Sequence, residues 1–161
     1  MTSGRAGLAA RARLREESSA DADFLLALYA TTRADEVAGL PEPQRSAFLR
    51  QQLAAQDAHF RAVFPAAERR IVCVGDVPVG RLYVDRSVDE VRIVDVALVP
   101  EFRGKGIGDA LVRAVLADAA AAGVPARLHV LAGNPARRLY VRLGFRPTGW
   151  TGPYEQMEWL P

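Results

Sequence analysis

The segment Val91–Gly108, VRIVDVALVPEFRGKGIG, limits the possible folds of this chain more than any other part of it. Its beginning, Val91–Val99, is rich in Val and Ile, which is typical of a strand that is buried on both faces. Pro100 ends such a strand because proline has no N–H group to donate to the ladder. A glycine-rich turn follows, and a helical pattern runs on from Asp109. Backbone N–H groups at such a helix start are free and lie at the positive end of the helix dipole, so the sequence predicts a site for a phosphate or pyrophosphate.

Two common phosphate-binding motifs are excluded by single residues of this turn. Lys105 is followed by Gly106 and not by Ser or Thr, which excludes a P-loop. Asp109 stands where the dinucleotide-binding fingerprint needs its third glycine. The pattern that remains is Arg-x-x-Gly-x-Gly, with Arg103, Gly106 and Gly108, in which the side chains of Arg103 and Lys105 add positive charge.

Two sequence blocks, Pro100–Val112 and Asn134–Phe145, occur in an order that is typical of one known family. The first, PEFRGKGIGDALV, resembles the acyl-CoA signature of the GCN5-related N-acetyltransferases (GNAT), in which (Q/R)-x-x-G-x-(G/A) cradles the CoA pyrophosphate. The second, NPARRLYVRLGF, is similar to the family's N-x-x-A-x-x-L-Y-x-x-L-G-F helix, although Asn134 precedes Tyr140 by six positions and not by seven. One predicted strand, Arg127–Leu131, separates the blocks, and the resemblance covers residues 70–159.

The resemblance implies an acetyl-CoA-dependent N-acetyltransferase, in which the acceptor amine attacks directly in a ternary complex. Acetyl-CoA (CoA) is then the co-substrate, no metal is expected, and the acceptor is a primary amine on a small molecule or a protein. The alternative is a binding module that retains acyl-CoA as a sensor or assembly partner with little catalysis. A homodimer is an expectation at the level of the family.

The cofactor is expected to be held mainly by main-chain groups. The resemblance places the pyrophosphate on the turn residues Arg103, Gly104, Lys105, Gly106, Ile107 and Gly108, where a Cβ on the glycines would obstruct the phosphate. The family's splayed strand implies that main-chain groups of Leu98 and Val99 pair with the pantetheine arm. Asn134 caps the helix that it opens, or binds the pantetheine as the family's asparagine does, or does both.

The acid and base of the reaction have different degrees of support in the sequence. Tyr140 matches the family's tyrosine and is expected to contact the cofactor and protonate the departing thiolate; the alternative is a core tyrosine. Asp95 lies in a strand that is predicted to be buried, so it must pair with a cation or face the active-site cleft. His129 has the intrinsic pKa of a base, although a lone strand histidine is more often structural. Asp95 and His129 are the two candidate bases, with Glu90 as a third and a base acting through water as the alternative.

The acceptor is expected on the side opposite the cofactor, where the family places the first two helices and the last strands. The candidates there are Tyr29, Arg33, Asp35, Glu36, Trp150 and Tyr154. Asp35 and Glu36 would attract a cationic amine; the alternative is that they are solvated loop acids. Trp150 and Tyr154 flank a turn and would place aromatic surface over the acceptor, or they would simply cover the core.

Length and composition indicate one globular domain, residues 11–161, after a flexible tail at residues 1–10. The net charge is only +2, and no basic stripe interleaved with aromatic residues is present, so nucleic acid is not an expected partner. No apolar run reaches the length of a membrane span, and the first residues lack the apolar core of a signal peptide. We therefore expect a cytoplasmic protein with no membrane partner.

The order of the predicted elements indicates an α/β (α+β) fold. Arg69–Val74, Val77–Val84 and Glu90–Val99 are predicted to form a meander, which is followed by alternating helices and strands. This order predicts a GNAT-like, mixed, mostly antiparallel sheet of six to seven strands with about four flanking helices. The resemblance adds a splay between the fourth and fifth strands.

Overall fold

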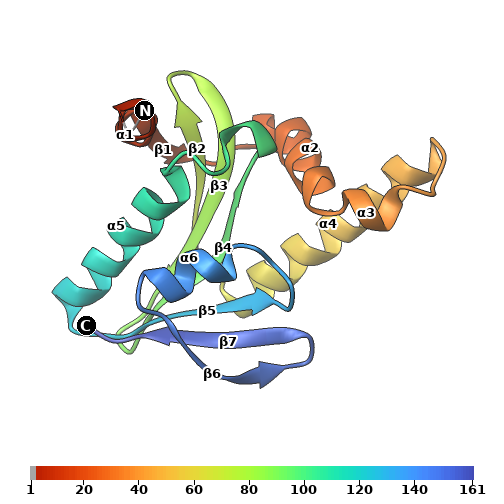
Figure 1. The fold of residues 1–161 in the computed structure, drawn as a ribbon. Coiled ribbons are helices and arrows are strands. Elements are labelled where there is room, and N and C mark those ends of the chain that lie inside the picture. The colour runs from red at the N-terminus through yellow and green to blue at the C-terminus, as the bar shows by residue number, and fades with distance from the viewer. Residues whose placement is uncertain (1–2) are drawn as a thin grey trace.

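A seven-stranded sheet forms the centre of residues 3–161, which are the residues that the computed structural model describes (Figure 1). The strands are β1 (Ala12–Glu16), β2 (Glu68–Val74), β3 (Val77–Arg86), β4 (Val91–Leu98), β5 (Ala126–Leu131), β6 (Arg146–Thr151) and β7 (Tyr154–Trp159). Their order across the sheet is β1-β2-β3-β4-β5-β7-β6. Among the strands of residues 3–161, only β4 and β5 run parallel, so the predicted mixed, mostly antiparallel sheet is confirmed.

Six α-helices lie in the described part of the chain: α1 (Ser3–Arg11), α2 (Ala22–Thr32), α3 (Ala34–Val37), α4 (Gln44–Val63), α5 (Ile107–Ala122) and α6 (Arg137–Arg142). Two 3-10 turns, η1 (Ser19–Asp21) and η2 (Pro100–Phe102), precede α2 and α5. The helices number two more than the four or so that the sequence predicts, and the short helices α1 and α3 account for the difference.

Helix α1 occupies most of the segment 1–10, for which the sequence predicts a flexible tail. The segment is rich in alanine, the residue with the highest helix propensity, and α1 lies in contact with α5. Residues 1 and 2 lie outside the described residues. The chain thus enters β1 directly from a helix, and the domain boundary at residue 11 stays a prediction.

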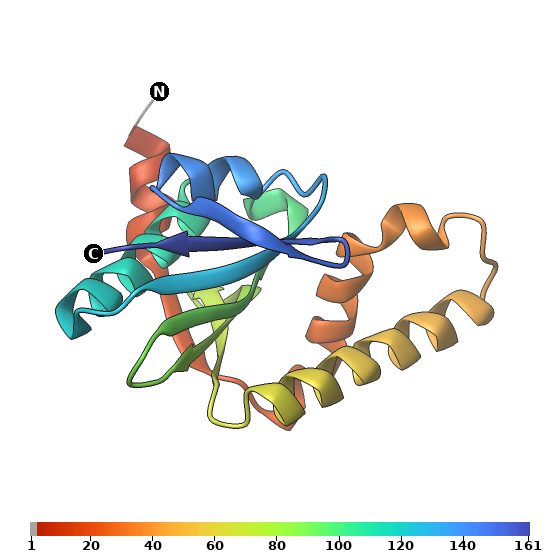
Figure 2. The same ribbon diagram turned by 90° about the horizontal axis from the view of Figure 1, so that it is seen from below.

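The helices cover the two faces of the sheet in separate groups (Figures 1 and 2). Helices α5 and α6 lie on one face, which we call the α5 face, where the main core includes Ile107, Leu128 and Tyr140. Helices α2 and α4 lie on the other, the α4 face, where Phe60 of α4 meets Tyr83 of β3 edge to face with ring centroids 6.2 Å apart. A ligand bound between the strands would therefore meet different side chains on the α5 face and on the α4 face.

The N-terminal half of α4 extends beyond the sheet together with α3 (Figure 2). A second, smaller core of Tyr29, Val37 and Leu49 joins α2, α3 and α4 there. Because this small core packs α2 against α4, it keeps the C-terminal end of α2 beside the sheet.

Strands β4 and β5 pair over a short length and then diverge. Their pairing stops at Ile93 of β4 and Leu128 of β5. Immediately beyond, Val94 is an extra residue in β4, because the register against β3 passes from Ile93 to Asp95. A bulge of this kind bends its strand and increases the local twist. The splay expected between the fourth and fifth strands is therefore present, and it begins at the bulge.

Candidate active site

The edge of β4 that borders this opening offers main-chain groups without a partner strand. The Val99 N–H donates to the Val79 carbonyl of β3 at 2.8 Å. Successive residues of a strand direct their main-chain groups to opposite sides, so those of Leu98 and Val96 face away from β3, into the opening. Accordingly, the Leu98 carbonyl accepts a hydrogen bond from Arg103 Nε at 2.8 Å, outside the ladder. Of the two expected pantetheine partners, Leu98 faces the opening and Val99 faces β3, while Val96 is a position that the sequence did not single out.

The turn before α5 uses backbone conformations that favour glycine. Gly104 and Gly106 have φ angles of +69° and +88°, a region that L-residues with a Cβ rarely adopt. Gly106 is the N-cap of α5, so the N–H groups of the first helical turn have no intrahelical partners. Ile107 is fully buried and anchors this turn in the main core. Gly108 lies under no such constraint, because a Cβ there would lie 3.6 Å from Leu139, an ordinary contact.

The two cationic side chains of the turn point to different places. Arg103 donates to the Leu98 carbonyl and, at 3.1 Å, to Thr31 Oγ1 of α2, so its guanidinium links β4 to α2. Lys105 is exposed, with Nζ 5.4 Å from the centre of the Phe102 ring. An anion at the turn would thus meet main-chain N–H groups and Lys105.

Tyr140 reaches the opening from the α5 face. Helix α6 packs its ring against Phe145, with centroids 5.8 Å apart, and the side chain lines the cleft between β4 and β5. Burial, and to a smaller degree the Asp95 carboxylate, raises the pKa of the Tyr140 hydroxyl above its ordinary value. Tyr140 therefore keeps its proton throughout the neutral pH range and can act as a donor.

Asp95 reaches the same opening from the α4 face, where the buried Arg81 holds it. Arg81 Nε donates to Asp95 Oδ2 at 2.6 Å, and Nη2 donates to Gln56 Oε1 of α4 at 2.7 Å. The Arg81 side chain is 7% exposed and that of Asp95 is 25% exposed. No described residue donates to Asp95 Oδ1. Asp95 thus pairs with a cation and also lines the cleft, which are the two outcomes that its place in the strand allows.

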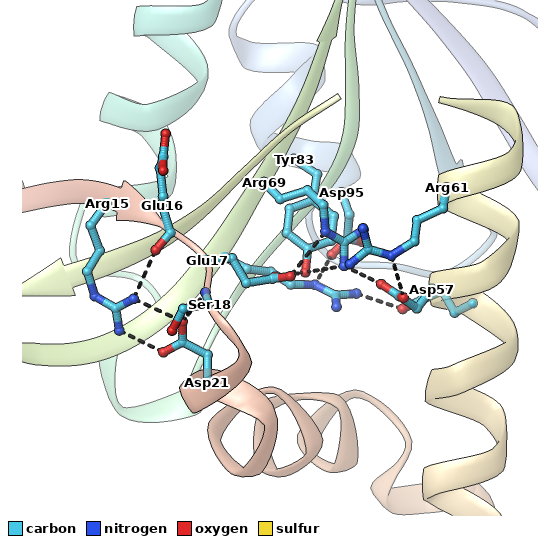
Figure 3. Close-up of polar contacts among 12 residues, drawn as sticks. Arg15, Glu16, Glu17, Ser18, Asp21, Asp57, Arg61, Arg69, Tyr83 and Asp95 are labelled. Carbon is cyan, nitrogen blue, oxygen red and sulfur yellow. Dashed lines mark hydrogen bonds and ion pairs between the residues drawn. The ribbon is translucent and has the colours of Figure 1, made fainter. Parts of the chain in front are cut away.

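A chain of polar groups that includes Glu17, Arg69, Tyr83 and Asp57 crosses the α4 face (Figure 3), and Arg81 joins it through Tyr83 and Asp95. The Tyr83 ring lies between two guanidinium groups, with Cζ of Arg69 4.2 Å and Cζ of Arg81 4.8 Å from its centre. The Tyr83 hydroxyl donates to Glu17, and Arg69 binds both Glu17 and Asp57 of α4. These contacts hold the Arg81 side chain in place and connect α4 to the strands β2, β3 and β4.

His129 projects from the α4 face of β5, across the opening from Asp95. Its strand neighbours Leu128 and Val130 are buried in the main core on the α5 face, so His129 lies on the opposite face. Burial, and secondly the charge of Arg92, lowers the pKa of His129. Glu90 is held by Arg92 at 3.2 Å and by Arg127 at 3.4 Å, at the end of β4 where the strands still pair. Asp95 and His129 therefore line the cleft, and Glu90 does not.

The cleft has a volume of about 200 Å³ and is bordered by α2, β4 and β5. Three of the expected acceptor residues line it: Tyr29 from α2, Arg33 at the end of α2, and Tyr154 from β7. Arg33 Nε donates to the Tyr29 hydroxyl at 3.2 Å. The wall of the cleft opposite Tyr140 is thus aromatic and cationic.

The remaining acceptor candidates lie outside the cleft lining. Asp35 and Glu36 are exposed residues of α3, and Glu36 binds Arg33 Nη1 at 3.0 Å. Trp150 is 60% exposed and stands opposite Glu155 in the β6–β7 register. Because Glu155 binds α6, Trp150 is on the α5 face, away from Tyr154. The structure therefore does not bring the expected acidic loop or the expected aromatic pair together over the acceptor.

Asn134 both lines the cleft and caps the segment before α6. Its Oδ1 accepts the Ala136 N–H at 2.9 Å, and its carbonyl accepts the Arg137 N–H at 3.1 Å. No described residue binds Nδ2, so the amide nitrogen remains available to a ligand. Asn134 can thus serve in both of the ways that the sequence allows.

Arg81 and Gln56 are site residues that the sequence did not reveal. A possible signal for Arg81 was an arginine within the apolar strand VPVGRLYV, which needs a buried anion just as Asp95 needs a cation. Gln56 carries no such signal, because a glutamine on a helix is ordinary. No group of three or more His, Cys, Asp or Glu in residues 3–161 could hold a metal ion. None of the described helices is long and apolar enough to cross a membrane.

An open strand edge leads into a helix start with free N–H groups, and titratable side chains line both sides of the opening, which is an arrangement that fits an acyltransferase of a CoA thioester. The model of the acetyltransferase (GNAT) family matches residues 25–145, most of the chain, and the protein belongs to this family. It is therefore an acetyltransferase of the GNAT family, as the resemblance of the two sequence blocks predicted.

Solved structures share the fold over nearly the whole chain. The PaiA N-acetyltransferase of Thermoplasma acidophilum, in complex with coenzyme A, has a TM-score of 0.69 at 17% identity, with 93% of this chain and 99% of that chain covered. An acetyltransferase of Thermus thermophilus has a TM-score of 0.67 at 19% identity, with 93% and 97% covered. A spermidine N-acetyltransferase SpeG chimera from Vibrio cholerae and hSSAT has 0.62 at 21%, with 93% and 95% covered. No curated protein matches the chain in sequence.

Proposed function

We propose that this protein transfers the acetyl group of acetyl-CoA to a primary amine by direct attack of the amine in a ternary complex. The observation that carries the proposal is the opening between β4 and β5, where Tyr140 from the α5 face and Asp95 from the α4 face line one cleft. The cofactor and the acceptor can therefore enter from opposite faces. The described residues of the lining include no cysteine or serine, which favours transfer without a covalent enzyme intermediate.

The residues around the opening fit CoA. The amides of a pantetheine arm suit the open main-chain edge at Val96 and Leu98, much as an added strand would. The pyrophosphate suits the free N–H groups that follow Gly106, with Lys105 beside them. Asn134 Nδ2 is a further donor on the cleft lining. When bound, acetyl-CoA supplies the acetyl group as a thioester.

Proton transfer is assigned to the residues on the two faces. Tyr140, kept neutral by burial, donates a proton to the thiolate that leaves. On the acceptor side, Asp95 Oδ1 can hold the amine, while His129, whose pKa is lowered, is neutral at pH 7 and free to accept its proton. Removal of His129 as His129→Gln should then abolish the acidic limb of the pH–kcat/KM profile. If the acidic limb persists in His129→Gln, the group that accepts the proton of the amine is Asp95 or water and not His129.

Ligand binding and thiol release together test the proposal. Acetyl-CoA and CoA should raise the Tm of the purified protein, because a ligand that binds only the folded state stabilises it by mass action. ATP and NAD serve as controls for general anion binding. Thiol release with a panel of amines then measures transfer. Binding without release from any amine would favour the alternative, an acyl-CoA sensor.

A matched pair of glycine variants separates the pyrophosphate site from general helix effects. Gly106→Asp places a negative charge at the start of α5 and should abolish CoA binding. Gly123→Asp places the same residue at the other end of the same helix, where Gly123 has φ +69°, and should leave CoA binding intact. Circular dichroism checks that both variants are folded. Retained CoA affinity in folded Gly106→Asp would refute the pyrophosphate assignment.

A further inference from the structure

The charges that line the active-site cleft are the reverse of those that a polycationic amine would need. The described lining contains two guanidinium groups, Arg33 and Arg81, and one carboxylate, Asp95. Arg81 and Asp95 neutralise each other at 2.6 Å. His129 adds no positive charge near pH 7, because burial and the charge of Arg92 lower its pKa. Arg33 is therefore the one lining charge without a counter-charge inside the cleft.

Arg33 has donors that the protein does not use. A guanidinium carries five N–H bonds. Nε donates to the Tyr29 hydroxyl at 3.2 Å, and Nη1 donates to Glu36 at 3.0 Å. The remaining three, one on Nη1 and two on Nη2, have no partner among the described residues. One N–H from each of Nη1 and Nη2 is the geometry with which arginine binds a carboxylate in a bidentate manner.

We infer that the acceptor is a small amino-carboxylate, and that Arg33 binds its carboxylate while its amine faces Asp95. The inference rests on the proposed function and names the substrate class of the same cleft. The cleft volume of about 200 Å³ suits a molecule of amino-acid size. The Arg33 side chain is only 24% exposed, so a carboxylate there meets a partly desolvated cation. A polyamine would instead bring more positive charge toward Arg33, and like charges in such a site repel.

A purely structural role for Arg33 makes a different prediction. In that case Arg33 only joins α2 to α3, through Tyr29 and Glu36. Loss of either partner of the ion pair, by Arg33→Gln or by Glu36→Gln, would then have the same effect. If Arg33 binds the acceptor, the two variants have different effects: Arg33→Gln loses the preference for the acid, whereas Glu36→Gln keeps or increases it, because Glu36 shares the same guanidinium.

The experiment compares acceptors that differ only in the carboxylate. Thiol release at saturating acetyl-CoA is measured for glycine, β-alanine, 4-aminobutyrate and tyrosine, each against the amine without the carboxylate: methylamine, ethylamine, propylamine and tyramine. Spermidine is the polycationic comparison. We expect the best acid to exceed its partner amine in kcat/KM by about 10- to 100-fold, the effect of a hydrogen bond between charged groups.

The variants then assign this preference to Arg33. Arg33→Gln should raise KM for the acid by about tenfold or more and leave the partner amine within twofold, whereas Arg33→Lys should retain part of the preference. Glu36→Gln should keep or increase it. Better turnover of spermidine or of the amines that lack a carboxylate overturns the inference, as do equal losses in Arg33→Gln and Glu36→Gln. CoA binding without turnover of any acid also overturns it, whereas absence of CoA binding overturns the proposed function itself.

Discussion

Replacement of Arg81 by methionine tests how strongly the polar chain on the α4 face supports the site. The variant keeps an unbranched side chain about as long as the arginine stem and removes the guanidinium. It loses the hydrogen bonds to Asp95 at 2.6 Å and to Gln56 at 2.7 Å. It also loses the stacking of the guanidinium on Tyr83. The Asp95 carboxylate is then left without a donor in the folded protein.

The loss of stability expected for Arg81→Met follows from the burial of the ion pair between Arg81 and Asp95. Removal of one partner from a buried ion pair costs about 3–5 kcal/mol. Because the Asp95 side chain is 25% exposed and keeps some hydration, we expect the lower end, about 3 kcal/mol. For a domain of this size, such a loss lowers Tm by about 6–12 °C. Typical domain stabilities of about 5–15 kcal/mol leave the variant folded at 25 °C.

Urea unfolding at pH 7 without CoA measures the loss in the free energy of unfolding, and three further variants serve as comparisons: Arg61→Met, Asp95→Asn and the double variant. Arg61→Met removes the exposed pair of Arg61 with Asp57 on α4 and should cost less than about 1 kcal/mol. Asp95→Asn combined with Arg81→Met removes both charges of the buried pair. The double variant should be more stable than the sum of the single losses predicts, by about 2 kcal/mol. Additive losses, or a loss for Arg81→Met no larger than that for Arg61→Met, would refute the assignment of a buried, coupled pair.

Three other perturbations test separate parts of the structure. Tyr140→Phe should lower kcat by about 100-fold or more while the CoA dissociation constant from calorimetry stays within about twofold; an unchanged kcat would assign the acid to another group. Gly80→Ala places a Cβ in steric overlap with the Ala97 carbonyl oxygen and should cost about 1–3 kcal/mol in the free energy of unfolding measured in urea, since Gly80 and Ala97 lie in paired strands that cannot easily move apart. The hydrogen bond from Arg15 lowers the pKa of Asp21 to about 2 from 3.8. Asp21 therefore contributes stability above its ordinary pKa that is lost as the pH falls through about 2, so Asp21→Asn should lower Tm at pH 7 and approach the wild type in acid.

The parts of the fold that could be predicted from sequence depend on residues close together in the chain. Pro100 ends the strand, Gly106 starts α5 with a positive φ, and Gly123 ends the helix with another. The hairpin at Gly75 likewise follows from a turn residue with φ +62° between two apolar strands. In each case the conformational preference of one residue is enough, so no distant contact is needed to decide the structure.

The alternation of side chains along a strand predicted less well which face of the sheet a residue lies on, because a bulge shifts the alternation. The register between β6 and β7 shifts between Pro147 and Gly149, so simple alternation does not predict the face of Trp150. A turn of two residues then places Tyr154 on the opposite face from Trp150. The bulge at Val94 similarly determines that Asp95 faces α4, and no residue type at Val94 announces it.

By itself, the sequence determined the class of enzyme and predicted a cofactor site, because the glycine turn and the helix that contains Tyr140 are contiguous motifs. Only the tertiary structure decided the charge of the acceptor cleft. Arg33, Arg81 and Asp95 come from α2, β3 and β4 and meet through packing. The sequence suggested an acidic entrance at Asp35 and Glu36, whereas in the folded chain Glu36 pairs with Arg33 from outside the cleft lining, and Arg33 has no counter-charge among the described lining residues. The net charge of a site depends on which ion pairs close in space, and that is a property of the packed structure rather than of the order of residues.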